Sequence, residues 1–402
     1  MSIRERLYEK VLAEHLHRHR QMALVSGPRQ VGKTTTCRGL STAYLDWDNT
    51  DDRRVILRGP AATAERIGLA RLGERPPVAV FDELHKFARW KSFLKGFFDT
   101  YADQARILVT GSSRLDVYRR GGDSLMGRYF PYRMHPFSVA EIAHHDLPRP
   151  ARIVRKPHRI SDADFRALWE HGGYPEPFVK RDARFTRRWA ALRRQQLLRE
   201  DIRDLTRIHE LDQMEALVNL LLERSGDRLG CANLAGDVQV AVDTVHRWID
   251  TLCGFHLGFL LRPWFANVPR SLRKEPKWFL RDWSGVADEG RRAETFVACH
   301  LLKAVEGWTD LGLGEFQLGY LRDKNRREVD FIVVRDRKPW ILVEVKKSRQ
   351  QPSPSLRHFQ ERTGAPHVFQ VVLEAEYVEA DCFARPGRPL VVPARTFLSQ
   401  LL

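Results

Sequence analysis

Short apolar runs and longer amphipathic stretches alternate along this 402-residue chain. Apolar runs near residues 23–25, 43–45, 78–81, 107–109 and 129–134 predict strands. A helical spacing of apolar positions marks residues 7–20, 162–170, 181–207 and 241–252. Near the end of the chain, strand patterns at 328–334, 341–346 and 367–372 enclose a helical pattern at 356–362. The alternation predicts an α/β protein.

The first predicted strand runs into Gly-x-x-x-x-Gly-Lys-Thr, a pattern typical of a phosphate-binding loop. A loop bracketed by Gly27 and Gly32 can turn its backbone N–H groups around phosphates, and the helix starting near Lys33 adds partial positive charge. We expect Lys33 to reach the β- and γ-phosphates and the Thr34 hydroxyl to ligate Mg²⁺. The expected nucleotide-binding residues are Gly27, Pro28, Arg29, Gln30, Val31, Gly32, Lys33, Thr34 and Thr35.

Two carboxylates, Asp82 and Glu83, directly follow the apolar run at 78–81. Acids at the carboxyl end of a buried strand form the companion motif of a phosphate loop. We expect Asp82 to hold Mg²⁺ through water and Glu83 to orient and polarise the attacking water. The next strand ends in Gly111-Ser112-Ser113. Ser112 or Ser113 is a candidate sensor of the γ-phosphate, and a turn with a serine helix N-cap is the alternative.

Arg128 lies between a predicted helix over residues 115–126 and the last strand of this region. An arginine there is placed to reach the γ-phosphate of a neighbouring subunit, which predicts a homo-oligomer, such as a hexameric ring. The alternative is that Arg128 caps the carboxyl end of its own helix, where a cation is favoured.

Together these features resemble the prokaryotic AAA-type P-loop ATPases that carry a C-terminal region of uncharacterised role. The resemblance rests on the loop at 27–34, Asp82-Glu83, the strand end at 110–113 and Gly127-Arg128 ahead of residues 136–138. It implies a five-stranded parallel α/β core over residues 1–150, with ATP as the nucleotide and Mg²⁺ as its companion ion.

Residues 151–210 are expected to form a helical lid, because Gly172-Gly173-Tyr174-Pro175 resembles the lid of this class. The helix that follows is rich in arginine, which predicts contact with DNA or RNA phosphates or, alternatively, an ordinary solvated face. Its arginines are Arg184, Arg187, Arg188, Arg193, Arg194 and Arg199.

Residues 211–285 resemble a winged helix. In this interpretation Gly236-Asp237 is the turn, residues 241–252 form the recognition helix, and a basic hairpin at 270–277 is the wing. The outward positions of the recognition helix are Asp243, Thr244, His246 and Arg247. Nucleic-acid binding is the predicted role, and protein contact is the alternative.

Residues 286–402 hold a second group of acids. Glu294 lies on a predicted helix, Asp330 on one strand, and Glu344 and Lys346 on the next, where alternate residues face the same way. Three carboxylates and a lysine predict a Mg²⁺ site for phosphodiester cleavage. The order resembles the PD-(D/E)xK nuclease core. The alternative is a relic that keeps DNA binding and no longer cuts.

Composition narrows the class of protein. The formal net charge of +16 favours a polyanionic partner, and DNA is the partner we expect. The five cysteines include no Cys-x-x-Cys pair, so they indicate neither a zinc site nor a disulfide framework. With no apolar run long enough to span a bilayer and no signal-like start, we expect a cytoplasmic protein without membrane contact. The predicted function is an ATP-driven machine acting on DNA, and the alternative is a signalling or defence ATPase that binds a protein partner.

Overall fold

The structure is a computed structural model that describes residues 4–69, 76–111, 125–202, 210–264, 275–348 and 351–402. The chain forms two compact units, Met1–His135 and Pro136–Leu402. Residues 136–150, which were expected to close the first domain, belong to the second unit. The finer division into four domains stays a prediction.

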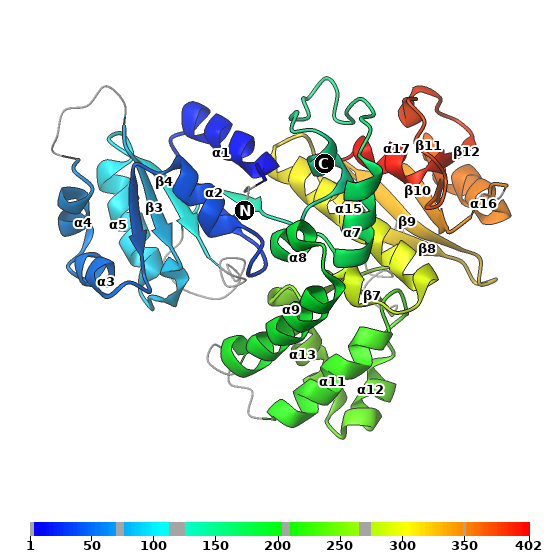
Figure 1. Ribbon diagram of the computed structural model, residues 1–402, viewed down its shortest axis with the longest axis horizontal. Coiled ribbons are helices and arrows are strands. Elements are labelled where there is room, and N and C mark those ends of the chain that lie inside the picture. Colours follow the sequence, from blue (N-terminus) through cyan, green and yellow to red (C-terminus); the bar gives the residue numbers. More distant parts are fainter. Residues whose placement is uncertain (1–3, 70–75, 112–124, 203–209, 265–274, 349–350) are drawn as a thin grey trace. The chain divides into compact units, whose positions relative to one another are not determined.

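Five parallel strands form the sheet of the first unit, in the order β2-β3-β4-β1-β5 (Figure 1). They are β1 (Met22–Ser26), β2 (Ala43–Asp46), β3 (Val78–Asp82), β4 (Arg106–Thr110) and β5 (Tyr129–Arg133). This confirms the predicted parallel α/β core. Because β4 lies between β1 and β3, its carboxyl end lies between the phosphate loop and the Asp82-Glu83 pair.

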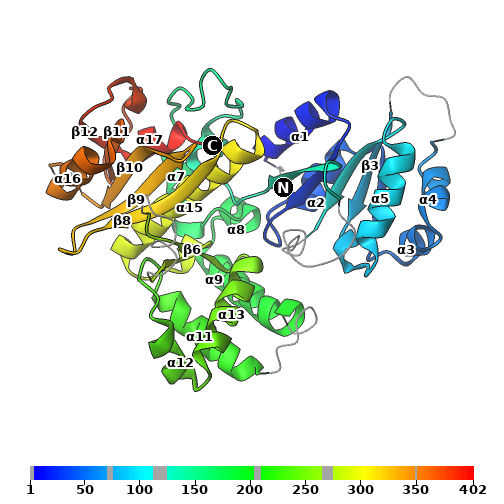
Figure 2. The same ribbon diagram turned by 180° about the vertical axis from the view of Figure 1, so that it is seen from behind.

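Helices cover both faces of this sheet (Figures 1 and 2). They are α1 (Leu7–Arg18), α2 (Lys33–Leu40), α3 (Thr50–Leu57), α4 (Pro60–Arg66) and α5 (Trp90–Tyr101). Successive strand residues face opposite sides, so Leu24, Phe81 and Val109 share one buried cluster with Phe93 and Phe97 of α5. The predicted helix over 115–126 lies largely outside the described residues, and Ser112 and Ser113 lie outside them.

The second unit begins with helices. They are α6 (Val139–Ala143), α7 (Asp162–His171), α8 (Pro175–Lys180) and α9 (Ala183–Gln196), followed by a π-helical turn at Leu197–Ile202. Three more helices, α11 (Leu211–Glu223), α12 (Cys231–Val238) and α13 (Val242–Gly254), precede an antiparallel strand pair, β6 (Gly258–Leu261) and β7 (Lys277–Leu280). Val245, Trp248 and Leu252 bury one face of α13 in the core that joins these elements.

One predicted turn in this region is wrong. Gly236 and Asp237 lie inside α12, and the turn comes at Gln239, whose φ of 56° is left-handed. The physical reason is that Val238 is buried in the core of the three helices, so packing extends the helix past the glycine. Of the predicted wing at 270–277, residues 270–274 lie outside the described residues.

The C-terminal part of the second unit is a mixed sheet in the order β12-β11-β10-β9-β8. Its elements are α15 (Glu289–Asp310), β8 (Phe316–Arg322), β9 (Glu328–Arg335), β10 (Lys338–Lys346), α16 (Pro354–Thr363), β11 (His367–Val372), β12 (Pro389–Pro393) and α17 (Ala394–Ser399). β8, β9 and β10 are antiparallel neighbours, whereas β11 and β12 run parallel to β10. Among the described residues, no helix is both long and apolar enough to cross a membrane.

Candidate functional site

The phosphate loop has a backbone that only glycine fits at two points. Gly27 has φ of 147°, and a Cβ atom there would lie 2.3 Å from the carbonyl oxygen of Met134. Gly32 has φ of 100°, in the left-handed region that favours glycine. Gln30 is also left-handed, with φ of 62°. Backbone of this kind turns successive N–H groups inward, which suits an anion.

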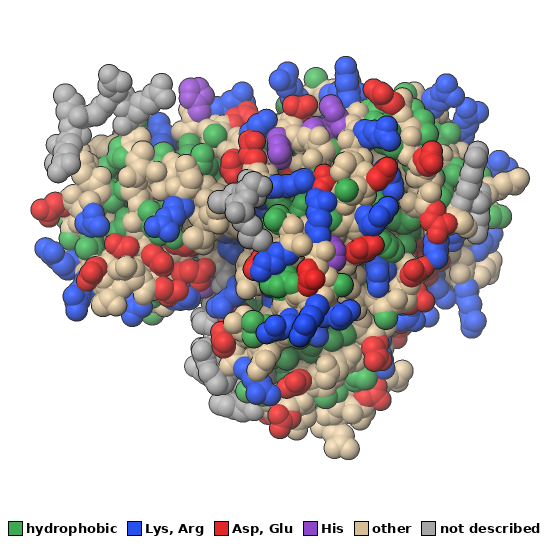
Figure 3. All heavy atoms as spheres, viewed as in Figure 1, with side chains coloured by type: hydrophobic (Ala, Val, Ile, Leu, Met, Phe, Trp, Pro, Cys, Tyr) green, Lys and Arg blue, Asp and Glu red, His purple; other side chains and the backbone are tan. Residues whose placement is uncertain are grey.

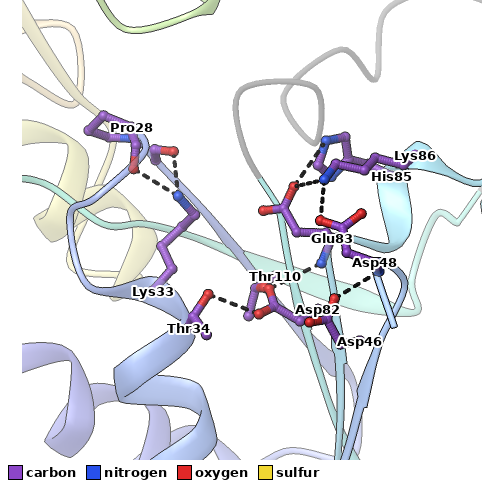
Figure 4. A network of polar contacts seen from close by, with 11 residues as sticks. Pro28, Lys33, Thr34, Asp46, Asp48, Asp82, Glu83, His85, Lys86 and Thr110 are labelled. Carbon is purple, nitrogen blue, oxygen red and sulfur yellow. Dashed lines mark hydrogen bonds and ion pairs between the residues drawn. The ribbon is translucent and has the colours of Figure 1, made fainter. Parts of the chain in front are cut away.

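Lys33 lies at the start of α2 and points back into the loop (Figure 4). Its ammonium donates to the carbonyl oxygens of Gly27 at 2.9 Å and Pro28 at 2.8 Å. The residue is 6% exposed, and burial lowers the pKa of Lys33 to about 8. A desolvated ammonium inside a ring of backbone dipoles is a cation that a phosphate would stabilise.

Asp82, at the end of β3, joins three strands and the phosphate loop. Its Oδ2 accepts from the hydroxyls of Thr34 at 2.9 Å and Tyr44 at 2.5 Å. Its Oδ1 accepts from the hydroxyl of Thr110, the last residue of β4, and from the backbone N–H of Glu83 at 3.1 Å. The residue is 3% exposed. A hydroxyl and a carboxylate side by side form the oxygen donor set that Mg²⁺ prefers, so these residues fit the expected ion.

Glu83 follows Asp82 in a left-handed conformation, with φ of 52°, which costs about 1 kcal/mol or more in a residue with a side chain. Its carboxylate lies 3.4 Å from the Lys86 ammonium and 3.7 Å from His85 (Figure 4). Lys86 also pairs with Asp48 at 2.5 Å. Burial raises the pKa of Glu83, while Lys86 and Lys33 oppose that rise. The surrounding structure therefore holds Glu83 in a strained position beside the loop.

Arg6 braces the phosphate loop from the start of α1. Its guanidinium donates to the carbonyl oxygen of Val31 and, at 2.6 Å, to that of His135. The residue is 4% exposed. The buried guanidinium lies between two carbonyls and thereby links the loop backbone to His135, two residues after the end of β5.

The other predicted nucleotide-binding residues follow the loop geometry. Pro28 and Val31 are buried, whereas Arg29, Gln30 and Thr35 are exposed. Ser112 falls outside the described residues, and Thr110 makes the contact between β4 and the acidic motif instead.

Arg128 is paired within its own chain. Its guanidinium makes two hydrogen bonds to Asp99 of α5, at 2.7 and 2.9 Å. Its own backbone carbonyl accepts from Met22, the first residue of β1, so Arg128 lies at the opposite end of β1 from the phosphate loop. A role in a neighbouring subunit stays a prediction.

Comparison with protein families agrees with this geometry. Residues 19–143 match a family model described as an AAA domain. The fold of this region is that of an AAA-type P-loop ATPase. Residues 162–287 and 289–382 match two models described as domains of unknown function, DUF8612 and DUF4143.

The relatives found by sequence have no described activity. They include the uncharacterized proteins Mb2031c of Mycobacterium bovis and Rv2008c of Mycobacterium tuberculosis. Each is 26% identical over 275 residues, which cover 67% of this chain and 56% of the relative. The chain thus matches little more than half the length of these relatives. The solved structure of C. elegans PCH-2 is 13% identical, over 60% of this chain and 66% of that chain, with a TM-score of 0.24.

Outside the AAA domain, the predicted acids of the C-terminal region lie on neighbouring elements. Lys346 pairs with Glu344 at 2.9 Å, and Asp330 accepts from the backbone N–H of Val345 at 2.8 Å. Burial, and next the charge of Asp330, raise the pKa of Glu294 to about 7. Burial also raises the pKa of Asp330. Glu294, Asp330, Glu344 and Lys346 therefore share one electrostatic environment.

A lysine from the end of the predicted wing enters this acidic cluster. Lys277, the first residue of β7, is 5% exposed. Its ammonium lies 2.5 Å from Glu328 and 3.9 Å from Glu294. Burial lowers its pKa, but the charges of Glu294, Asp330 and Glu328 outweigh burial and raise the pKa of Lys277 overall. Lys277 is therefore a resident cation among the acids. Of the acids that the structure describes in this cluster, no three have ligand oxygens within 4.8 Å of one another.

Several functional contacts carry no signal in the sequence. Tyr44 and Arg6 have no local motif, because their partners lie far away in the chain. Thr110 belongs to the strand end at 110–113 that supports the resemblance, but its contact with Asp82 was not predicted. The strand order could have indicated Thr110. It is the last residue of β4, which lies between the strand that leads into the phosphate loop and the strand that ends in Asp82. Lys277 and Glu328 carry no sequence signal beyond their charge.

Proposed function

We propose that the protein binds ATP with Mg²⁺ at the phosphate loop and hydrolyses it. The observation that carries the proposal is the meeting of Thr34 and Thr110 on the carboxylate of Asp82. It joins the loop, the acidic motif and the intervening strand end at one edge of the sheet. The AAA-domain match over residues 19–143 supports it.

Each side chain then has a defined task. Lys33 contacts the β- and γ-phosphates in place of its present carbonyl partners, while Thr34 and Asp82 hold Mg²⁺, which neutralises charge on the phosphates. Glu83 orients the attacking water and polarises it. Arg128 supplies charge to the transition state of a neighbouring subunit after leaving Asp99.

Glu83→Gln tests this assignment. The variant keeps nucleotide binding, because the loop is intact, and loses turnover by orders of magnitude, because the water is no longer oriented by a carboxylate. Phosphate release and the affinity for a fluorescent nucleotide would be measured on the same preparation. Glu65→Gln, an exposed change on α4, is the matched control. Wild-type turnover in Glu83→Gln would overturn the role of Glu83.

We further propose that the second unit binds nucleic acid. The order of three helices and an antiparallel strand pair resembles a winged helix and supports this proposal, as does the exposure of His246 and Arg247 on α13. Arg184, Arg187, Arg188 and Arg199 are exposed on α9 and the turn after it, where Lys and Arg side chains gather (Figure 3). Arg193 and Arg194 are exceptions to the predicted outward face, because both are half-buried. Arg193 stacks on Tyr174 at 4.1 Å.

Salt dependence tests the nucleic-acid proposal. Replacing Arg187 and Arg188 by alanine should weaken binding to DNA. The slope of log affinity against log salt should fall by about 0.9 for each phosphate that the variant no longer neutralises. Arg357→Ala, an exposed change on α16, is the control. A slope unchanged by the double substitution would refute phosphate binding through α9.

The C-terminal acids support two functions. Metal-dependent cleavage of DNA is the first candidate, and it is supported by the order α15-β8-β9-β10-α16-β11, with Glu294 on α15, Asp330 on β9 and Glu344 and Lys346 on β10. The ammonium of Lys277 beside Glu294 favours the second candidate, an ATPase whose C-terminal region binds its partner without cutting. Cleavage of linear, flapped, forked and four-way DNA with Mg²⁺ or Mn²⁺ decides between them. If wild type cleaves DNA and Asp330→Ala does not, the nuclease is established. If wild type leaves every substrate intact, the non-cutting function is established.

A further inference from the structure

Two histidines and an aspartate come together in the segment between α6 and α7. The ligand atoms of His144, Asp146 and His158 all lie within 4.8 Å of one another. Among the residues that the structure describes, this is the one such group of three acidic, histidine or cysteine side chains. It lies entirely within the second unit and has no part in the ATPase site.

The hydrogen bonds of His144 decide which ring nitrogen is available. Its Nε2 lies 3.2 Å from the carbonyl oxygen of Ser399, and a carbonyl only accepts, so Nε2 carries the proton. Nδ1 then presents a lone pair. A backbone carbonyl on the far nitrogen is the arrangement that orients histidine ligands of metal ions.

The available nitrogen faces a carboxylate. Nδ1 of His144 lies 3.6 Å from Oδ2 of Asp146, is buried and makes no hydrogen bond, while the His144 side chain is 8% exposed. Two acceptors facing each other repel unless a cation joins them.

His158 completes the group. Its ring stacks on that of His144 with centroids 4.1 Å apart, and its backbone N–H donates to the Ser399 hydroxyl at 3.2 Å. Ser399, at the end of α17, therefore holds both histidines. The side chain of Asp146 is 74% exposed, which leaves the group open to ions from solvent.

The donor set selects the class of ion. Two imidazole nitrogens and one carboxylate suit Zn²⁺ and related late first-row ions better than Mg²⁺ or Ca²⁺, which prefer oxygen alone. With bonds of about 2.0 Å, tetrahedral ligand atoms lie about 3.3 Å apart, close to the separation of Nδ1 and Oδ2. Three protein ligands leave one position for water.

One neighbouring charge opposes a cation. Arg155 is buried, donates to the Asp146 carbonyl at 2.7 Å and to the Leu401 carbonyl at 2.8 Å, and retains its charge although burial lowers its pKa to about 10. The charges of Glu141 and Asp146 offset it in part. Arg155 therefore weakens binding of a cation without occupying the space between the ligands.

We propose that His144, Asp146 and His158 bind one Zn²⁺ ion, which fastens the 144–158 segment to the end of α17 through Ser399. The proposal is independent of nucleotide hydrolysis.

Metal titration of the full chain tests it. Protein freed of metal by a chelator is titrated with Co²⁺, followed by its visible absorption, and with Zn²⁺ in competition with a chromophoric chelator. Asp146→Asn and His158→Ala should each lower the affinity of one site at least about 100-fold and remove its Co²⁺ absorption. His145→Ala, next to the group, is the matched control and should leave the affinity unchanged.

The comparison of variants distinguishes this site from other groups that bind metal ions, such as the acids at Asp82 and Asp330 and the cysteines. Only the binding that is lost in both Asp146→Asn and His158→Ala is assigned to the His144 group. Circular dichroism confirms that each variant is folded, and Zn²⁺ should raise the melting temperature of wild type more than that of either variant. Absence of Zn²⁺ binding by wild type, or equal affinity and stoichiometry in both variants, overturns the proposal.

Discussion

Nucleotide binding should take up a proton at alkaline pH, because Lys33 is desolvated within the phosphate loop. Its pKa of about 8 lies well below the ordinary value of 10.5. Phosphates beside the ammonium restore the charged form and return the pKa towards its ordinary range or above. Uptake should therefore be small at neutral pH and large above pH 8.

The magnitude follows from the two pKa values. With the lysine at about 8 before binding and near its ordinary value afterwards, uptake is about 0.1 proton at pH 7 and about 0.75 proton at pH 8.5. Calorimetry of ADP with Mg²⁺ in two buffers of different ionisation enthalpy measures this number without turnover.

Two variants identify the group that takes up the proton. Glu83→Gln removes a neighbouring carboxylate whose charge raises the pKa of Lys33, so the uptake should persist and should grow at pH 7. Lys33→Arg, if it binds nucleotide, should take up almost none, since a guanidinium stays charged at both pH values. Equal uptake by wild type at pH 7 and pH 8.5 would refute the argument that Lys33 is a buried cation whose charge phosphate stabilises.

Three further predictions concern other groups. Burial lowers the pKa of His15 to about 4. The free energy of unfolding is therefore undiminished by this group above pH 6.5 and falls by up to about 3 kcal/mol as the pH drops towards 4. His15→Gln should flatten that loss in denaturant titrations, and an unchanged pH profile would contradict it. Lys277→Met removes the resident cation, so calorimetry should show tighter Mg²⁺ binding at the C-terminal acids, and adding Asp330→Ala should abolish that binding. An affinity of Lys277→Met for Mg²⁺ equal to that of wild type would exclude competition by Lys277. Mixing Arg128→Ala with Lys33→Ala subunits, each inactive alone, should restore ATPase activity if Arg128 acts in a neighbour, and no recovery in verified mixed oligomers counts against that role.

Local patterns predicted much of the fold. The loop from Gly27 to Thr34, the strand before it and the Asp82-Glu83 strand end are each encoded within a few residues, and the structure contains all of them. The parallel sheet followed from resemblance and is confirmed by the strand order. The turn expected at Gly236 failed because burial of Val238 outweighs the local preference of glycine.

Contacts between distant residues could not be predicted in this way. Arg6 reaches a carbonyl 129 positions away, and Lys277 meets an acid on an element that begins 12 residues later. Nothing in either neighbourhood distinguishes these cations from the many exposed ones. The His144 group combines close neighbours with Ser399 of α17, and cysteine spacing, the usual guide to zinc, gave no signal for it.

The bracing of the phosphate loop has a mechanical consequence. Gly27 lies against the Met134 carbonyl, and Arg6 ties Val31 to His135, the last residue of the first unit. The chain enters the second unit at the next residue, Pro136. If phosphate binds there as proposed, a displacement of the loop backbone would act on the residues beside the covalent connection between the units. Such a route would need no separate relay through the sheet.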